Sequence, residues 1–80
     1  MKKYLLYVRK YSIMINDYKM YVYICETNDV LHTIGEMYYR SLEAIKRITF
    51  VDYSKEREEY LLAKGYEIYN WYNKYENVIL

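Results

Sequence analysis

The chain has 80 residues, of which 54% are hydrophobic and 29% charged, and this length suits one small domain spanning residues 1–80. The formal net charge of +1 gives no strong overall attraction for nucleic acid. Cys25 is the only cysteine, which excludes an intrachain disulfide and a zinc site built from thiolates.

The first predicted element is a strand over residues 3–15. Arg9 ends the apolar run near its start, so the run is too short for a membrane span or a signal-peptide core, and we expect no membrane association. Residues 13–15 are apolar on both strand faces, which predicts a register shift or a β-bulge. Asn16 and Asp17 then favour a turn because both tolerate left-handed backbone.

A second strand is predicted over residues 18–27, where side-chain character alternates, and it would form a hairpin with the first strand. The predicted aliphatic face carries Leu6, Val8, Met20, Val22 and Ile24. The predicted tyrosine and basic face carries Tyr7, Arg9, Tyr11, Lys19, Tyr21 and Tyr23. Because an isolated hairpin is marginally stable in water, another element must cover the aliphatic face.

A helix is predicted to begin between residues 29 and 34, and its first residues also fit a short third strand of a meander. Asn28 or Asp29 would cap an early start, whereas Thr33 has capping-box spacing for a later one. An apolar stripe at helical spacing is expected to cover the hairpin. Its members are Ile34, Met37, Tyr38, Leu42, Ile45 and Ile48. The β-branched residues around Phe50 predict the helix end or a short strand.

A second helix is predicted to follow, with Asp52 or Ser54 as its N-cap. Apolar residues in steps of four and three favour one long, tyrosine-rich helix over residues 55–77. The alternative is that Gly65 ends the helix and that residues 66–72 form a last strand. We prefer the long helix because the two faces of that strand would be poorly divided between apolar and polar side chains.

One pair of short motifs carries a resemblance. The sequence VYI at residues 22–24 and TIG at residues 33–35, followed by Arg40, resembles the paired tripeptides and following arginine of the GIY-YIG nucleases. In that family the tripeptides lie on strands before a helix, and the resemblance implies metal-dependent cleavage. This chain lacks the first glycine, has Thr33 in place of a tyrosine, and offers no catalytic glutamate at a matching spacing.

No other motif indicates a reaction. His32 is the only histidine and lacks the partners that a metal site needs, and Cys25 has no histidine at motif spacing. We therefore expect no catalytic residue, no metal ion and no cofactor.

The unusual feature of the composition is its fourteen tyrosines. Tyrosine, lysine, asparagine and isoleucine have AT-rich codons, so an AT-rich genome explains part of this number. Tyrosine is also enriched where a protein meets a partner. The predicted partner-binding residues are Tyr7, Arg9, Tyr11, Lys19, Tyr21, Tyr23, Tyr69 and Trp71.

The sequence predicts an α+β fold, with a hairpin or three-stranded meander packed against one amphipathic helix and followed by a tyrosine-rich helix. The expected function is a non-enzymatic module that binds a protein and acts by occlusion. The alternatives are single-strand nucleic-acid binding by the tyrosine and basic face, or coverage of that face by the last helix or a second copy in a homodimer.

The small size and the many residues with AT-rich codons resemble those of phage and mobile-element proteins that inhibit host machinery, including anti-CRISPR proteins. The lone cysteine fits a reducing compartment. We therefore expect a cytoplasmic protein, which for a viral protein means the host cytoplasm.

Overall fold

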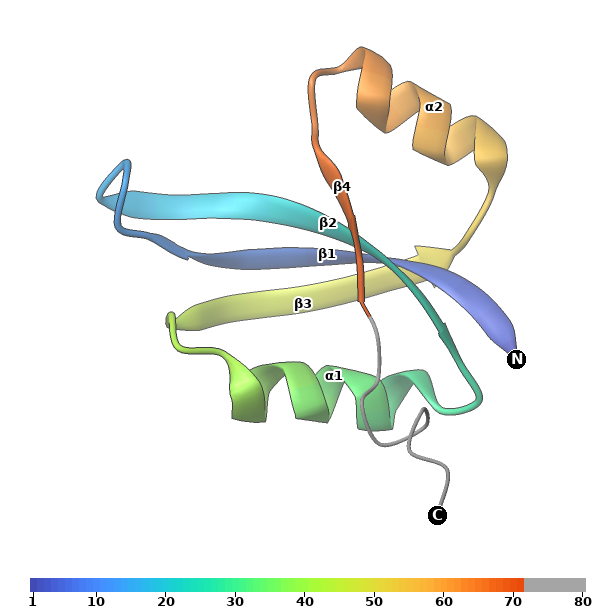
Figure 1. Ribbon diagram of the computed structural model, residues 1–80, viewed down its shortest axis with the longest axis horizontal. Coiled ribbons are helices and arrows are strands. Elements are labelled where there is room, and N and C mark those ends of the chain that lie inside the picture. The colour runs from blue at the N-terminus through green and yellow to red at the C-terminus, as the bar shows by residue number, and fades with distance from the viewer. Residues whose placement is uncertain (72–80) are drawn as a thin grey trace.

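The computed structural model of the chain describes residues 1–71 and contains one mixed four-stranded sheet with two helices (Figure 1). The elements are β1 (Lys2–Ser12), β2 (Asp17–Thr27), α1 (Val30–Arg40), β3 (Ile45–Asp52), α2 (Lys55–Ala63) and β4 (Ile68–Asn70). The strand order is β3-β1-β2-β4, with β1 antiparallel to β2 and β3, and with β4 parallel to β2. The predicted α+β class and the hairpin packed against α1 are confirmed.

The hairpin of β1 and β2 closes through a turn at residues 13–16. Ser12 pairs with Asp17, and Asn16 has a φ of 52°, the left-handed conformation that asparagine tolerates. Residues 13–15 lie in this turn, with their side chains exposed, and do not continue β1. The first strand was therefore predicted too long at its C-terminal end.

The faces of the hairpin differ from the prediction. Leu6 lies opposite Tyr23, and Tyr7 lies opposite Val22, because odd-numbered residues of β1 pair with even-numbered residues of β2. Residues paired across two strands point to the same face of the sheet. Aliphatic and tyrosine side chains are therefore present on both faces, and the predicted separation into an aliphatic face and a tyrosine face is wrong.

α1 begins at Val30, the earlier of the two predicted starts. The Asp29 side chain caps the helix by accepting the backbone N–H of His32 at 3.1 Å. Thr33 is buried, and its hydroxyl donates to Thr27 Oγ1 at 3.0 Å, so it fastens the helix to β2 and does not cap it. The alternative third strand at the start of this segment is not formed.

β3 occupies residues that the apolar stripe assigned to the first helix. α1 ends at Arg40, and Ser41 is already extended. Leu42 therefore lies in a loop, while Ile45 and Ile48 belong to β3, which pairs with β1 at the edge of the sheet.

α2 begins where predicted but is short. The Ser54 side chain accepts the backbone N–H of Arg57 at 3.1 Å and caps the helix, which ends at Ala63. Gly65 follows with a φ of 92°, the conformation that favours glycine after a helix end.

The chain then forms β4, which pairs with β2 over Ile68–Asn70. Up to residue 71, the prediction of one long helix over residues 55–77 is therefore wrong. The alternative prediction of a strand over residues 66–72 is partly correct. Residues 72–77 of that prediction lie outside the described part of the chain.

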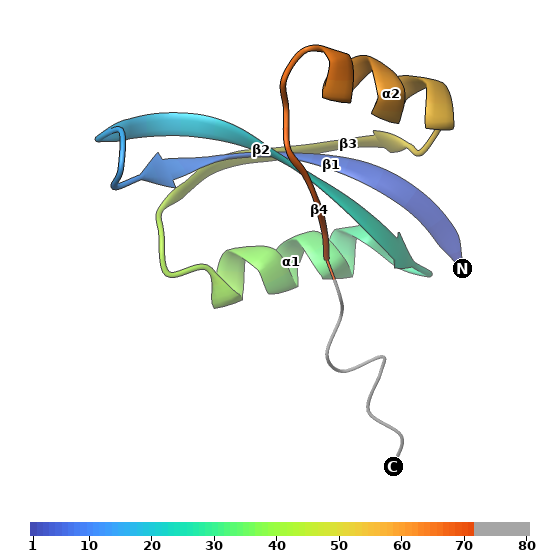
Figure 2. The ribbon, with the colours of Figure 1, turned by 45° about the horizontal axis from the view of Figure 1, so that its top comes forward.

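The two helices cover opposite faces of the sheet, which we call the α1 side and the α2 side (Figure 2). The buried residues of the α1 side are Leu6, Val8, Cys25 and Met37, and those of the α2 side are Leu5, Val22 and Leu61. α2 lies over one half of its face and leaves the half toward the hairpin turn open (Figure 2). Within residues 1–71, neither helix is long and apolar enough to cross a membrane.

Candidate binding surfaces at the hairpin end

The predicted partner-binding residues are divided between the two faces of the sheet. The α2 side holds Tyr7, Arg9 and Tyr11, and the α1 side holds Lys19, Tyr21, Tyr23, Tyr69 and Trp71. The odd-to-even pairing of β1 with β2 causes this division, so two smaller surfaces replace the single surface that was predicted.

The α1-side aromatic group is built by β2 and β4. Tyr69 lies opposite Tyr23 with ring centroids 5.5 Å apart, and Trp71 meets Tyr23 edge-on at 6.2 Å. Lys10 Nζ donates to the Tyr23 hydroxyl at 3.2 Å and lies 4.7 Å from the ring centroid of Tyr21. Tyr21, Tyr23 and Trp71 pack against the α1-side core, so much of their surface serves folding.

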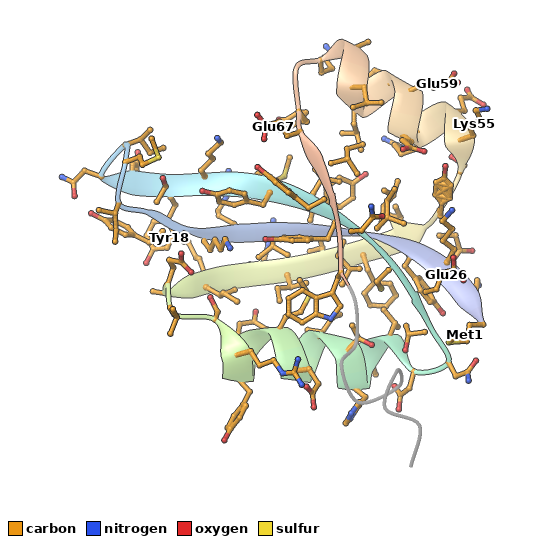
Figure 3. The ribbon with its side chains drawn as sticks, in the orientation of Figure 1. Met1, Tyr18, Glu26, Lys55, Glu59 and Glu67 are labelled. Carbon is orange, nitrogen blue, oxygen red and sulfur yellow. The ribbon has the colours of Figure 1, made fainter. Side chains whose placement is uncertain are left out.

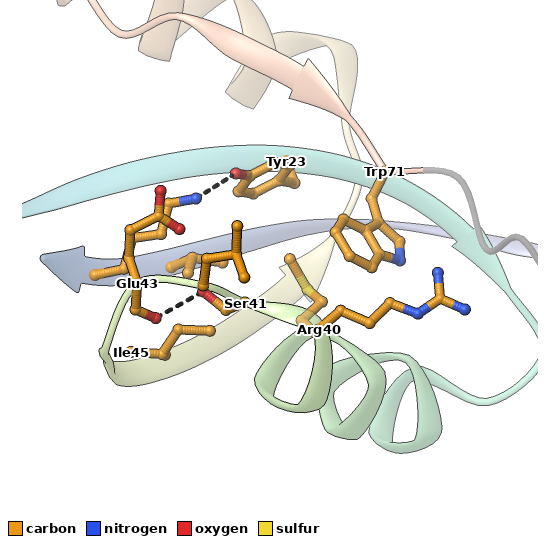
Figure 4. Close-up of a pocket in the computed structure, with 10 residues that line it drawn as sticks. Tyr23, Arg40, Ser41, Glu43, Ile45 and Trp71 are labelled. Carbon is orange, nitrogen blue, oxygen red and sulfur yellow. Dashed lines mark hydrogen bonds between the residues drawn. The ribbon is translucent and has the colours of Figure 1, made fainter. Parts of the chain in front are cut away.

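A cavity of about 260 Å³ opens beside this group, between the end of α1 and the start of β3 (Figure 4). Tyr23 and Trp71 lie on one side of it, and its two cations are Lys10 and Arg40. Arg40 Nε lies 3.1 Å from Glu36 Oε2 in an ion pair along α1. The cavity is smaller than most drug-sized ligand sites and suits one inserted side chain.

The Tyr69 hydroxyl donates to Glu67 Oε2 at 2.7 Å. This hydrogen bond to the neutral phenol raises the pKa of Tyr69 above its ordinary value, and desolvation raises it further. Tyr69 is therefore uncharged at neutral pH and serves as a hydrogen-bond donor.

On the α2 side, β3 brings two further cations beside the predicted residues. Arg47 lies directly opposite Arg9, and the register shift between Arg9 and Lys10 adds Lys46 to the same neighbourhood. Lys46 Nζ lies 5.3 Å from the ring centroid of Tyr18. Sequence reasoning missed this group because it placed residues 46 and 47 on a helix.

The turns at this end of the molecule carry exposed apolar side chains. Ile13 is 80% exposed, Met14 96% and Ile15 55%, while Leu42 in the neighbouring α1–β3 turn is 99% exposed. A backbone hydrogen bond of 2.9 Å from Tyr11 N to Ala44 O joins the end of β1 to the α1–β3 turn. The two turns lie at the same end of the molecule in Figure 1. We call these four side chains the apolar tip. Its signal in the sequence was the apolar run at residues 13–15.

The motif residues take structural positions. VYI at residues 22–24 lies on β2, but TIG at residues 33–35 lies inside α1, so the two-strand arrangement implied by the nuclease resemblance is not formed. His32 Nε2 lies 3.7 Å from Glu36 Oε1 on exposed helix surface. Cys25 is buried in the α1-side core. In the part of the chain that the structure describes, no three His, Cys, Asp or Glu side chains gather as a metal site would require.

The geometry thus offers an apolar tip, a small cavity and a cationic group, all near the hairpin turn. Comparison with models of protein families, with curated proteins and with solved structures finds no match for the chain.

Proposed function

We propose that the protein is a non-enzymatic binding module that docks on another protein through the apolar tip and acts by covering the partner's surface. The observation that carries the proposal is the exposure of Ile13, Met14, Ile15 and Leu42 on two turns at the same end of the molecule (Figure 1). Scattered exposed apolar side chains are ordinary, but a group held at one end of a molecule is typical of an interface.

The energetics favour this use of the tip. Full burial of a leucine, isoleucine or methionine side chain contributes about 1.5–3 kcal/mol, so the four residues supply about 6 kcal/mol or more against the cost of association. The hairpin strands hold the turn in place, which reduces the conformational entropy lost on binding. The cavity beside Leu42 and Ile45 would accept one side chain of the partner.

Cations surround the tip and give the partner a charge preference. Lys10 lies opposite Lys19 on the α1 side, and Arg9 lies opposite Arg47 on the α2 side. These charges would steer the tip toward an acidic surface and raise the association rate at low salt. The partner that fits is therefore a protein with an apolar hollow inside an acidic rim.

The class of partner rests on composition. The small size and the many residues with AT-rich codons resemble those of phage and mobile-element inhibitors. We therefore propose that the partner is a nucleic-acid-processing machine of a host cell, such as a CRISPR effector. The protein would then act in the host cytoplasm. A second copy of the chain is the other protein partner that the proposal includes.

Met14→Asp tests the proposal, because a carboxylate in the apolar tip opposes burial and faces an acidic partner. The matched control is Leu31→Asp: Leu31 is 69% exposed in the first turn of α1, away from the hairpin turn, where an acid suits the helix dipole. Solution mass by light scattering is measured first, followed by capture from an extract of the cells that make the protein.

Support would be a dimer, or a captured protein, that wild type and Leu31→Asp share and that Met14→Asp loses. The proposal fails if Met14→Asp, still folded by circular dichroism, retains the same mass and captures the same protein as the control.

A further inference from the structure

A cationic group lies on the open half of the α2 side and joins Arg9, a residue of the predicted tyrosine and basic face, to two cations of β3. Arg9 and Arg47 are direct cross-strand neighbours, and Lys46 is the additional residue at the register shift beside them. The three side chains line one surface hollow of about 370 Å³ and are exposed. Like charges placed opposite each other destabilise a sheet, so this arrangement has a cost in the free protein.

No acidic side chain within the described residues forms an ion pair with these cations. The ion pairs of residues 1–71 are Lys2–Asp52, His32–Glu36 and Arg40–Glu36, and none includes Arg9, Lys46 or Arg47. Lys55 and Glu59 of α2 lie on the other half of the sheet from Tyr18 (Figure 3). An anionic ligand would therefore relieve the repulsion and meet no nearby α2 carboxylate.

Two tyrosine rings extend the cationic group toward the hairpin turn. Tyr11 and Tyr18 are paired across the hairpin and meet edge to face, with centroids 5.7 Å apart and ring planes at 81°. The Tyr11 hydroxyl donates to Asn16 Oδ1, which fixes its ring, and Lys46 lies over the Tyr18 ring. Tyr18 is 37% exposed, so part of its ring surface is available to a ligand.

We infer that Arg9, Lys46 and Arg47 with Tyr11 and Tyr18 form a binding site for single-stranded nucleic acid. Arginine guanidinium groups bind phosphates, and tyrosine rings stack on unpaired bases whatever their sequence. Bases in a duplex already stack on each other, so a duplex would use the cations alone. An acidic protein would also use only the cations, which makes it the outcome to be excluded.

Fluorescence anisotropy with a labelled oligo-dT of about 12 nucleotides tests the site. Three phosphate contacts give a slope of about −2 for log K against log salt, so affinity should fall about fifteenfold from about 50 to about 200 mM salt. Arg9→Gln with Arg47→Gln should flatten this slope and weaken binding at low salt. Lys19→Gln, on the α1 side, is the matched control and should change affinity by no more than about twofold.

The stacking contribution is tested separately. Tyr18→Ala removes the ring and should weaken oligo-dT binding about tenfold, whereas Tyr18→Phe keeps the ring and should bind nearly as well as wild type. Duplex DNA of the same length should bind more weakly than oligo-dT. The thermal unfolding midpoint of each variant is compared with wild type, so that a folding defect is not read as lost binding.

Three results would overturn the inference: no oligo-dT binding at low salt, equal weakening by Lys19→Gln and by the arginine pair, or complete displacement by polyglutamate at matched charge. The last result would mean that the site recognises negative charge alone and that its natural ligand is an acidic protein. Met14→Asp should leave oligo-dT binding in place, so this site and the protein-docking proposal can fail independently.

Discussion

At the residue scale, Tyr53 shows how a single side chain joins two elements. It follows β3, and its hydroxyl donates to Glu58 Oε1 on α2, while Lys3 Nζ lies 4.3 Å from its ring centroid. The hydrogen bond to Glu58 raises the pKa of Tyr53, with desolvation as a smaller cause. The protonated phenol is therefore favoured in the folded state.

This raised pKa predicts a titration. The stabilisation from Tyr53 is complete below its unfolded pKa of about 10 and is lost as the pH rises through the higher folded value. The difference in tyrosinate absorbance between wild type and Tyr53→Phe should then have its midpoint above pH of about 10. In Glu58→Gln that midpoint should move down toward the ordinary value. A difference curve centred at or below the ordinary value would contradict the assignment.

At the element scale, the elements set by local signals were predicted best. The start of β2, the caps Asp29 and Ser54 and the turn at Asn16 all depend on neighbours in the sequence, and each appears in the structure. The short strand offered as an alternative around Phe50 is the second half of β3. The first half of β3 was missed because Leu42, Ile45 and Ile48 continue a helical spacing by coincidence after Arg40.

The strand β4 and the hairpin register depend on distant contacts. β4 is short and forms only against β2, and its tyrosines fit a helix stripe as well as a strand. The register fixes which side chains share a face, so the predicted partner-binding residues were assigned to one surface although they lie on two. The predicted set did not include Tyr18, Lys46 and Arg47, nor the four residues of the apolar tip.

The pairing of β1 with β3 carries a second prediction. Arg47→Glu replaces a like-charged cross-strand pair with an attractive one and should raise the free energy of unfolding by roughly 0.5 kcal/mol. Urea denaturation measures the change. Arg47→Gln removes only the repulsion and should give a smaller gain.

The same Arg47→Glu substitution should weaken oligo-dT binding, so stability and binding would change in opposite directions. That result would mark the Arg9–Arg47 pair as a feature kept for a ligand. A glutamate variant less stable than the glutamine variant would show that Arg9 and Arg47 do not repel each other across the strands.

At the scale of the whole molecule, two thin cores share one sheet, and they are unequal. On the α1 side Leu6, Val8, Cys25 and Met37 are buried together, and α1 also buries Thr33. On the α2 side the buried residues are Leu5, Val22 and Leu61, and Leu61 is the only buried residue of α2. Small domains bury a limited share of their surface, and their free energy of unfolding is small. Loss of either core would therefore remove a large part of that free energy.

This inequality predicts two different responses to truncation. Leu6→Ala should lower the free energy of unfolding by about 3 kcal/mol and increase amide hydrogen exchange throughout the sheet. Leu61→Ala should increase exchange mainly in α2 and β4 and leave α1 protected. Equal exchange of α1 and α2 in Leu61→Ala would contradict two separable cores.

The register of β1 with β2 also bears on how the chain chooses its pairing. A slip of one residue would place Leu6 opposite Val22 and would collect Leu6, Val8, Met20, Val22 and Ile24 on one face, with Leu5 on the other. The observed pairing, with Leu6 opposite Tyr23, divides apolar surface between two faces and is favourable only when a helix covers each.

A peptide of residues 1–28 has neither helix, so it should populate the slipped pairing, which nuclear Overhauser contacts between Leu6 and Val22 would report. Contacts between Leu6 and Tyr23 alone would mean that the turn selects the register by itself. If the peptide adopts the slipped pairing, then the complete fold sets the alignment of β1 with β2, because only the two helices make the observed register the more stable one.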